Sequence, residues 1–307
     1  MGRYVVRRLL QAIPVFIGTT FIIFALVYAL PGDPIRALSG DKPVSPAVYA
    51  ELTSRYNLND PLLVQYGKYL GALVQGDFGQ SFRGREVADI MAERFPVTVR
   101  LAVVAFAFEI LIGIAAGVLA GLRRGSFIDN LVLLTTTLVV SIPVFVLGFT
   151  AQVLLGVQLG WFPIAGTSQG WYSYLLPGLV LGAISLAYVA RLTRTSLVEN
   201  MRADYVRTAT AKGLPRTRVV GRHALRNSLI PVVTYLGIDL GALMGGAIIT
   251  EGIFNLPGIG QQVFLSIRAQ EGPVVVGIVT VLVLIFIFAN LVVDLLYAVL
   301  DPRIRYD

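Results

Sequence analysis

The sequence predicts an all-α membrane protein with six transmembrane helices. Of its 307 residues, 56% are hydrophobic and only 14% are charged, whereas a soluble domain carries about a quarter charged residues to cover its surface. The apolar residues also gather in six runs, each near or above the roughly 18 residues that cross a hydrocarbon core. These runs are residues 9–30, 101–122, 131–157, 175–192, 229–249 and 274–300.

The first run could be mistaken for a cleaved signal peptide, because three arginines precede it. The apolar core of a signal peptide is about 7–15 residues long and ends at small residues. This run continues to Leu30 and ends in the sequence Pro-Gly-Asp-Pro. We therefore expect an uncleaved first helix.

Residues 31–100 form a long segment between the first two runs. A capping residue precedes proline at Ser45-Pro46 and again at Asp60-Pro61, which predicts two helix starts. Apolar residues then recur at helical spacing from Leu62 to Leu73, as in an amphipathic helix that lies on the membrane surface or against the bundle. We expect an external amphipathic cap segment rather than a separate domain, so that residues 1–307 form a single transmembrane domain.

Two prolines interrupt the middle runs. Pro143 lies inside the third run and Pro177 lies near the start of the fourth. Within lipid, a proline persists where neighbouring groups satisfy the carbonyl that it frees. We therefore expect kinks at these positions that face protein.

The distribution of charge predicts the orientation. Six spans place both termini on one side, and short cytoplasmic loops retain Lys and Arg. The side with the termini carries sixteen basic and five acidic residues, so both termini are expected in the cytoplasm. A nucleic-acid surface is the competing interpretation of this basic excess. We disfavour nucleic-acid binding, because the charges follow the membrane boundaries and no nucleic-acid motif accompanies them.

The chain lacks cysteine and contains one histidine, His223. The absence of cysteine excludes disulfides, thiolate metal sites and thiol catalysis in this chain. A single histidine also excludes a site built from several histidines, and no metal site is expected.

Residues 191–228, between the fourth and fifth runs, form the predicted cytoplasmic loop. We expect the fourth helix to continue through residues 193–212, because no helix breaker occurs before Gly213 and Pro215. Gly213 suits the left-handed position that ends a helix, and a second helix is expected to rise from Pro215. This basic helix–turn–helix is predicted to be a docking element. The alternative is a solvated basic loop that touches lipid headgroups.

Residues 204–215 (DYVRTATAKGLP) resemble the coupling loop of ABC importer permeases. The general form of that loop is Glu-Ala-Ala, three residues, Gly, nine residues and Ile-x-Leu-Pro. Ala209, Gly213 and Leu225 match this form. The residues that depart from it are Arg207, Thr208, His223 and Arg226. The wording Arg-Thr-Ala and His-Ala-Leu-Arg-Asn is similar to that of the peptide-importer branch.

Further motifs extend this resemblance over nearly the whole chain. They are residues 30–34 (LPGDP), 76–79 (GDFG), 95–98 (FPVT), 141–145 (SIPVF) and 246–260 (GAIITEGIFNLPGIG). The chain is thus identified as a member of the dipeptide, oligopeptide and nickel family of type I ABC importer permeases. Such importers pair two different permeases, and the long external segment resembles the first of them, the B-type permease of dipeptide importers.

The resemblance implies a multi-pass permease subunit of an ATP-driven importer in the bacterial inner membrane. The implied cargo is dipeptides or oligopeptides; nickel chelates, glutathione or another small solute remain alternatives. The implied partners are a second, different permease subunit, two ATPase subunits and an extracytoplasmic substrate-binding protein, besides membrane lipid.

The resemblance also implies two sets of site residues. The expected ATPase-coupling residues are Arg207, Ala209, Gly213, Leu214, His223 and Leu225. Glu251, Phe254 and Pro257 resemble the external loop that contacts the binding protein and gates the path.

The chain is not expected to be an enzyme. A P-loop requires Gly-Lys followed by Ser or Thr, and the three lysines are followed by Pro43, Tyr69 and Gly213. ATP and magnesium are therefore expected on the partner ATPase subunits, with no cofactor in this chain.

Glu109 and Asp239 lie within spans at a comparable depth, where an ionisable group costs at least about 2.5 kcal/mol and is normally paired or faces water. With Gly241 and Gly245 they are the candidate residues of the translocation path. The alternative is a structural ion pair or hydrogen bond between helices. Gly241 and Gly245 belong to a series of small residues four apart, which favours close packing within the chain or against a second permease subunit.

A third acid, Asp294, is expected to meet Arg191 or Arg194. An intramembrane aspartyl protease would need two carboxylates close enough to share a proton. Asp239 and Asp294 differ in depth by about 6 Å, and no Gly-x-Gly-Asp sequence precedes either. An ion channel is disfavoured because it would not need an ATPase-docking loop.

Overall fold

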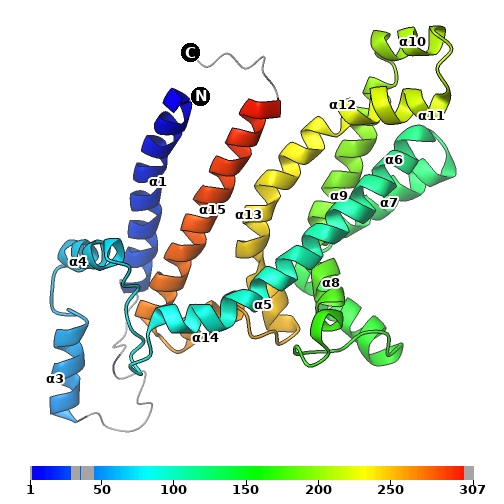
Figure 1. The fold of residues 1–307 in the computed structure, drawn as a ribbon. Helices are drawn as coiled ribbons and strands as arrows, with labels where there is room; N and C mark the ends of the chain where they lie inside the picture. Colours follow the sequence, from blue (N-terminus) through cyan, green and yellow to red (C-terminus); the bar gives the residue numbers. More distant parts are fainter. Residues whose placement is uncertain (1, 29–34, 36–44, 301–307) are drawn as a thin grey trace.

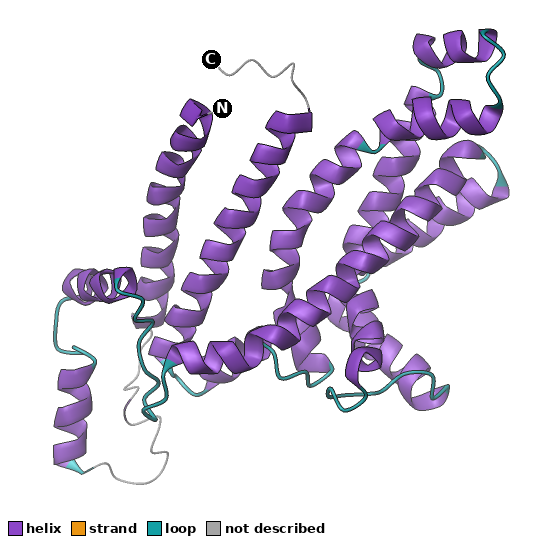
Figure 2. Cartoon of the chain, viewed as in Figure 1, coloured by secondary structure: helices purple, strands orange, loops and turns teal. Residues whose placement is uncertain are grey.

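The computed structural model describes residues 2–28, 35 and 45–300. Within these residues the secondary structure is helical apart from one isolated β-bridge, between Gln80 and Glu86 (Figure 2). The prediction of an all-α protein is thus confirmed for the described part of the chain.

The first and last helices pack side by side. α1 (Gly2–Tyr28) contacts α15 (Gly272–Leu300), and both lie at one side of the molecule (Figure 1). The start of α1 and the end of α15 lie at the same end of the bundle as α10 (Asp204–Ala211). This arrangement agrees with an even number of crossings.

The external segment contains two short helices, α3 (Pro46–Arg55) and α4 (Leu62–Val74). The predicted cap of α3 is confirmed, because Val48 N donates to Ser45 Oγ at 3.3 Å. The predicted cap of α4 is wrong. Asp60 does not cap α4, which begins after Pro61 without a side-chain cap. The Asp60 carboxylate instead accepts a hydrogen bond from Lys68 Nζ at 2.6 Å.

Tyr69 anchors α4 to the bundle. Its hydroxyl donates to Thr280 Oγ1 at 2.7 Å. Burial raises the pKa of Tyr69 to about 12, so the phenol keeps its proton at neutral pH. The predicted amphipathic helix therefore lies against the bundle.

The second span begins earlier than the sequence suggested. α5 (Val87–Phe108), a π-helical turn (Glu109–Gly113) and α6 (Ile114–Leu122) form one helix of 36 residues. The charged residues between 87 and 100 concealed its first turns. Residues 87–100, assigned to the cap segment, thus already belong to this helix.

The third run is broken rather than kinked. α7 (Phe127–Ser141) is followed by α8 (Val144–Ala151) and a π-helix (Gln152–Gln158), with a bend of 106° around Pro143. A 3₁₀ turn (Gly170–Tyr174) then leads into α9 (Leu175–Asn200). Pro177 lies buried in the first turn of α9, where the helix loses no hydrogen bond to it.

The fifth run follows a chain of short helices. These are α11 (Arg216–Arg218), a π-helix (Val219–Leu225) and α12 (Arg226–Ser228), which meet α13 (Ile230–Ile253) at a bend of 44°. α14 (Ile259–Arg268) follows at the opposite end of α13 (Figure 1).

Within the described part of the chain, four helices are individually long and apolar enough to cross a membrane, and up to six spans result if each bent pair counts as one. Large apolar side chains are exposed on the outer helices, among them Leu134 and Leu138 of α7 and Phe149 of α8. Such exposed surface is expected where lipid replaces water as the solvent.

Glycines bring the second and fourth spans into close contact. A Cβ at Gly117 would lie 2.5 Å from the backbone oxygen of Ala190, and one at Gly113 would lie 2.8 Å from Val189. Gly178 of α9 is equally close to Val104 of α5, at 2.5 Å. We call this contact the glycine seam; side chains at these positions would force the two helices apart.

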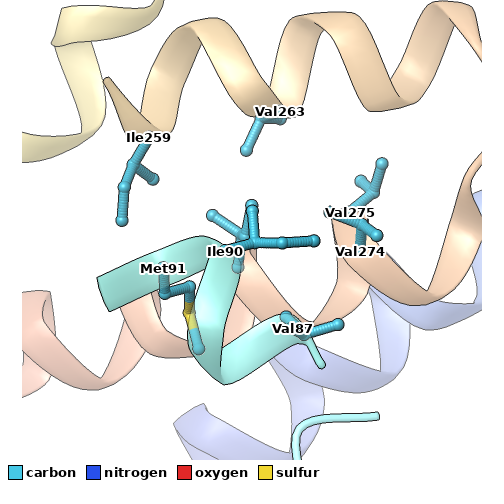
Figure 3. Close-up of a cluster of buried hydrophobic side chains, with 8 residues drawn as sticks. Val87, Ile90, Met91, Ile259, Val263, Val274 and Val275 are labelled. Carbon is cyan, nitrogen blue, oxygen red and sulfur yellow. The ribbon is translucent and has the colours of Figure 1, made fainter. Parts of the chain in front are cut away.

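The end of the bundle opposite α10 (Figure 1) has its own apolar core. Val87, Ile90 and Met91 of α5 pack against Ile259 and Val263 of α14 and against the start of α15 (Figure 3). This core fixes α14 against the helices on either side of it.

Candidate functional site

Most of the loop that was predicted to be cytoplasmic folds into a compact elbow, residues 197–228. The predicted continuation of the fourth helix through residue 212 is wrong, because α9 ends at Asn200 and a turn precedes α10. This turn lets Val206 and Ala209 of α10 pack against Leu197, together with Val219 and Ala224. Burial of apolar side chains thus overrides the helical propensity of residues 201–203.

Gly213 ends α10 as predicted. Its φ is +75°, the left-handed conformation that glycine adopts without strain, and its N–H donates to Thr210 O at 2.9 Å. The chain then reverses at Pro215 and returns towards the membrane. The predicted bend is confirmed, and Gly213 lies exposed at it.

Some of the predicted coupling residues are buried in the elbow core, and others lie on the surface of the elbow. Ala209 is buried in the elbow core, and Leu214 packs at its edge. Arg207 is exposed and lies 3.5 Å from the exposed carboxylate of Asp204. His223 and Leu225 are half-buried. The exposed side of the elbow also presents Arg202, Tyr205, Thr208, Lys212 and Arg216.

A largely buried ion pair joins α9 to α7. Arg194 Nε and one terminal nitrogen donate to the two carboxylate oxygens of Asp129, at 2.7 and 2.8 Å. Asp129 also accepts from Gly125 N at 2.8 Å. The expectation that Asp294 would meet Arg191 or Arg194 stays untested. Arg191 donates to Thr136 and Thr137, and the side chain of Asp294 lies outside the described residues.

Glu109 and Asp239 face each other within the membrane region. Glu109 is 0% exposed, and neither of its carboxyl oxygens has a hydrogen-bond donor. Asp239 accepts from Ser185 Oγ at 2.9 Å through one oxygen, while its other oxygen is buried without a donor. Two facing carboxyl groups with unused acceptors can hold a shared proton or a cationic group.

The close approach of α9 makes room for this carboxyl pair. A Cβ at Gly182 would lie 3.1 Å from Glu109 Oε1, so the glycine leaves space for the acid between the helices. Glu109 is also the first residue of the π-helical turn, a distortion frequent at functional sites.

Gly241 and Gly245 of α13 lie in different surroundings. A Cβ at Gly241 would lie 3.2 and 3.3 Å from Ala289 and Phe286 of α15, so Gly241 packs within the chain. A Cβ at Gly245 would meet no atom within 4 Å. Gly245 therefore lies on a part of α13 that the described residues leave open.

The three residues predicted to form the external gate lie around the end of α13, and they are buried or half-buried. Glu251 and Phe254 are both 0% exposed, and Pro257 is half-buried. Thr98 Oγ1 of α5 donates to Glu251 Oε1 at 2.5 Å. The exposed residue at the tip of the loop is Asn255, with a φ of 47°.

Sequence reasoning missed the partners of these residues. Thr98 lies within a quoted motif and Arg194 was considered for another acid, but neither was linked to its actual partner, which lies 153 and 65 residues away, respectively. Asn255 lies within a quoted motif but was not singled out. Among the described residues, no group of three acidic, histidine or cysteine side chains could hold a metal ion.

Comparison with known proteins matches the chain along almost its whole length. Residues 113–306 match the family described as binding-protein-dependent transport system inner membrane component. Residues 1–102 match the N-terminal region of membrane components of the same transport systems.

Three relatives align over 100% of both sequences. The dipeptide transport system permease protein DppB of Alkalihalophilus pseudofirmus and the di/tripeptide transport system permease protein DppB of Pseudomonas aeruginosa are each 39% identical. The glutathione transport system permease protein GsiC of Escherichia coli K12 is 41% identical.

Proposed function

This chain belongs to the family of binding-protein-dependent transport system inner membrane components, as a permease subunit of an ABC importer in the bacterial inner membrane, and we propose that it imports dipeptides and oligopeptides. The names of the two DppB relatives support this cargo. Glutathione is the second candidate, because GsiC is similarly related. Glutathione is itself a short peptide, so one path could suit both cargoes.

The elbow is the observation that carries the mechanism. Its core of Leu197, Val206 and Ala209 makes it a rigid unit, while its outer side is exposed and basic. A rigid, exposed projection suits docking to an ATPase subunit. Movement of that subunit would then reach α9 and α13, which continue from the elbow into the bundle.

We propose that the complete importer contains this chain, a second permease subunit, two ATPase subunits and an extracytoplasmic binding protein. The ATPase subunits would bind ATP and magnesium, and this chain would hydrolyse nothing. The open surface around Gly245 suits the second permease subunit. Asp239, Glu109 and Gly241 would then lie near the path between the two.

The whole chain is proposed to act as one transmembrane domain with cytoplasmic termini. The charge asymmetry supports this orientation, and so does the common end at which α1 begins, α15 ends and α10 lies. Single cysteines can test it, because the chain has none of its own. A membrane-impermeant maleimide should label Val74→Cys in intact cells and Lys212→Cys only after the membrane is opened. The reverse pattern would contradict the orientation.

The cargo is tested with the purified complex in lipid nanodiscs, its binding protein and a panel of ligands. Dipeptides and oligopeptides should stimulate ATP hydrolysis, with glutathione and a nickel chelate as comparison ligands. Stimulation by glutathione alone would replace the peptide proposal with the second candidate. A lack of response to any peptide would overturn it.

A further inference from the structure

The carboxylate of Glu251 lies at a junction of three helices. It belongs to the last turn of α13, it is 0% exposed, and its two oxygens accept from Thr98 Oγ1 of α5 (2.5 Å) and from Gln261 N of α14 (2.9 Å). The Thr98 hydroxyl in turn accepts from Ile259 N of α14 at 2.8 Å. An amide, a hydroxyl and a carboxylate thus form one continuous buried network.

This network replaces the missing cap of α14. The residue before the helix is Gly258, which has no side chain to satisfy the first free N–H groups. Thr98 and Glu251 accept from two of them instead, and a negative charge is favourable at a helix N-terminus. A Cβ at Gly258 would overlap the Glu251 carboxylate. An acid from another helix therefore takes the place of a local cap.

The same network reaches the exposed tip of the external loop. The backbone of Gln261 is held by Glu251, and its side-chain amide donates to Asn255 Oδ1 at 2.8 Å. On the other side of the tip, Gly166 N donates to Phe254 O at 2.9 Å. Asn255 is thus the exposed end of a loop whose neighbours, Phe254 and Leu256, are both buried.

We propose that Glu251 is a positioning residue: together with Thr98 it caps α14 from outside, and through Gln261 it sets the external tip at Asn255 in the orientation that the binding protein meets. Glu251 therefore acts within the chain and touches neither cargo nor partner. Its role at the binding protein rests on the proposed function, whereas its role as the cap of α14 does not.

Three variants separate charge, hydroxyl and shape. Glu251→Gln keeps the shape of the side chain but turns a donor towards the amide of Gln261. Thr98→Val removes the hydroxyl at nearly constant volume, and Thr98→Ser is its matched control. The two threonine variants keep the proposal testable if Glu251→Gln does not fold.

The first measurement reports α14 directly in the full complex. A spin label at Leu265→Cys, an exposed position on α14, should become more mobile in Thr98→Val and Glu251→Gln but not in Thr98→Ser. A label at Val74→Cys on α4 should remain unchanged in all three. Equal mobility of the spin label at residue 265 in the parent and in Thr98→Val would overturn the proposed capping of α14.

The second measurement tests the orientation of the loop tip at Asn255 through the response of the complex to the binding protein. Thr98→Val and Glu251→Gln should raise the concentration of loaded binding protein that gives half-maximal ATPase stimulation by about tenfold, the effect of one lost hydrogen bond to a charged group. In Thr98→Val the basal ATPase activity and the maximal stimulated rate should stay within about twofold of the parent, and Thr98→Ser should be unchanged. An equal loss of basal activity in all variants would show a general structural defect and overturn the positioning role. If the parent complex itself does not respond to any binding protein, the proposed function fails while the spin-label result stands.

Discussion

α13 joins two regions that are built in opposite ways. At the start of α13 the elbow buries apolar side chains, Leu197 and Ala209 among them, and exposes its charged ones. At the end of α13 the following loop region buries a carboxylate and a hydroxyl, and exposes little beyond Asn255. Charges on a surface are available to another protein, whereas buried polar groups fix the chain that carries them. The elbow thus keeps its charged groups available to its surroundings, whereas the loop after α13 depends on an internal support.

This contrast predicts different failures at the two ends. Damage to the elbow should separate ATP hydrolysis from uptake, and damage to the external loop should weaken the response to the binding protein. Four experiments test or refine this picture of α13 and its neighbours, from the largest expected effect to the smallest.

The largest effect is expected from the Arg194–Asp129 ion pair, which holds α9 to α7. Asp129→Asn should destabilise the protein by about 3 kcal/mol, because it leaves a largely buried arginine without its charged partner. Thermal unfolding of the purified complex in detergent measures this change. The double variant with Arg194→Gln should recover part of the loss. If the double variant loses the sum of the two single effects, the two residues are not energetically coupled.

Gly213→Pro should reduce uptake about a hundredfold while the protein still inserts. Proline cannot adopt a φ of +75°, and it removes the N–H that donates to Thr210, a combination that costs about 3 kcal/mol. Peptide uptake and ATPase activity in proteoliposomes measure the coupling. Gly213→Asn is the matched control, because asparagine tolerates the left-handed conformation. Normal uptake by the proline variant would contradict a rigid elbow.

Asp239→Asn should lower uptake by about tenfold if the carboxyl pair takes part in transport. The amide can still accept from Ser185 and can donate to Glu109, so little loss of stability is expected. Uptake rates in proteoliposomes, compared with the amount of inserted protein, separate the two roles. Unchanged uptake would assign the pair to helix packing and remove it from the path.

The smallest effects are expected from the paired variants Gly241→Ala and Gly245→Ala. A methyl group at Gly241 meets α15 within the chain, so that variant should make the isolated permease less stable by about 1 kcal/mol. A methyl group at Gly245 meets open space in this chain. It should leave the isolated permease unchanged and weaken co-purification of the second permease subunit about threefold. Loss of stability in the isolated Gly245→Ala permease would show that this surface is internal.

Much of the fold could be read from local sequence. The lengths of the apolar runs predicted the spans, and Gly213 followed by Pro215 predicted the bend, because few other residues suit a left-handed helix end. The family resemblance marked both ends of α13. These signals act over a few residues, and a single sequence displays them directly.

The rest depended on contacts between distant residues. The break after Asn200 was not predicted, because Met201, Arg202 and Ala203 give no signal against a helix; the burial of Val206 against Leu197 decides it. The start of the second span was missed because charged residues on its exposed side imitate a loop. For Glu251 the sequence could mark its importance but not its burial, which follows from Thr98 on another helix.

The glycine seam gives the carboxyl pair a further meaning. Because the backbones of the second span (α5 and α6) and of α9 are in direct contact, we expect these helices to move together. Glu109 belongs to the second span and Asp239 belongs to α13. Any stroke that the elbow delivers unequally to α9 and α13 must therefore alter the gap between these two acids. Relative movement of α9 and α13 would therefore change the surroundings of both carboxyl groups.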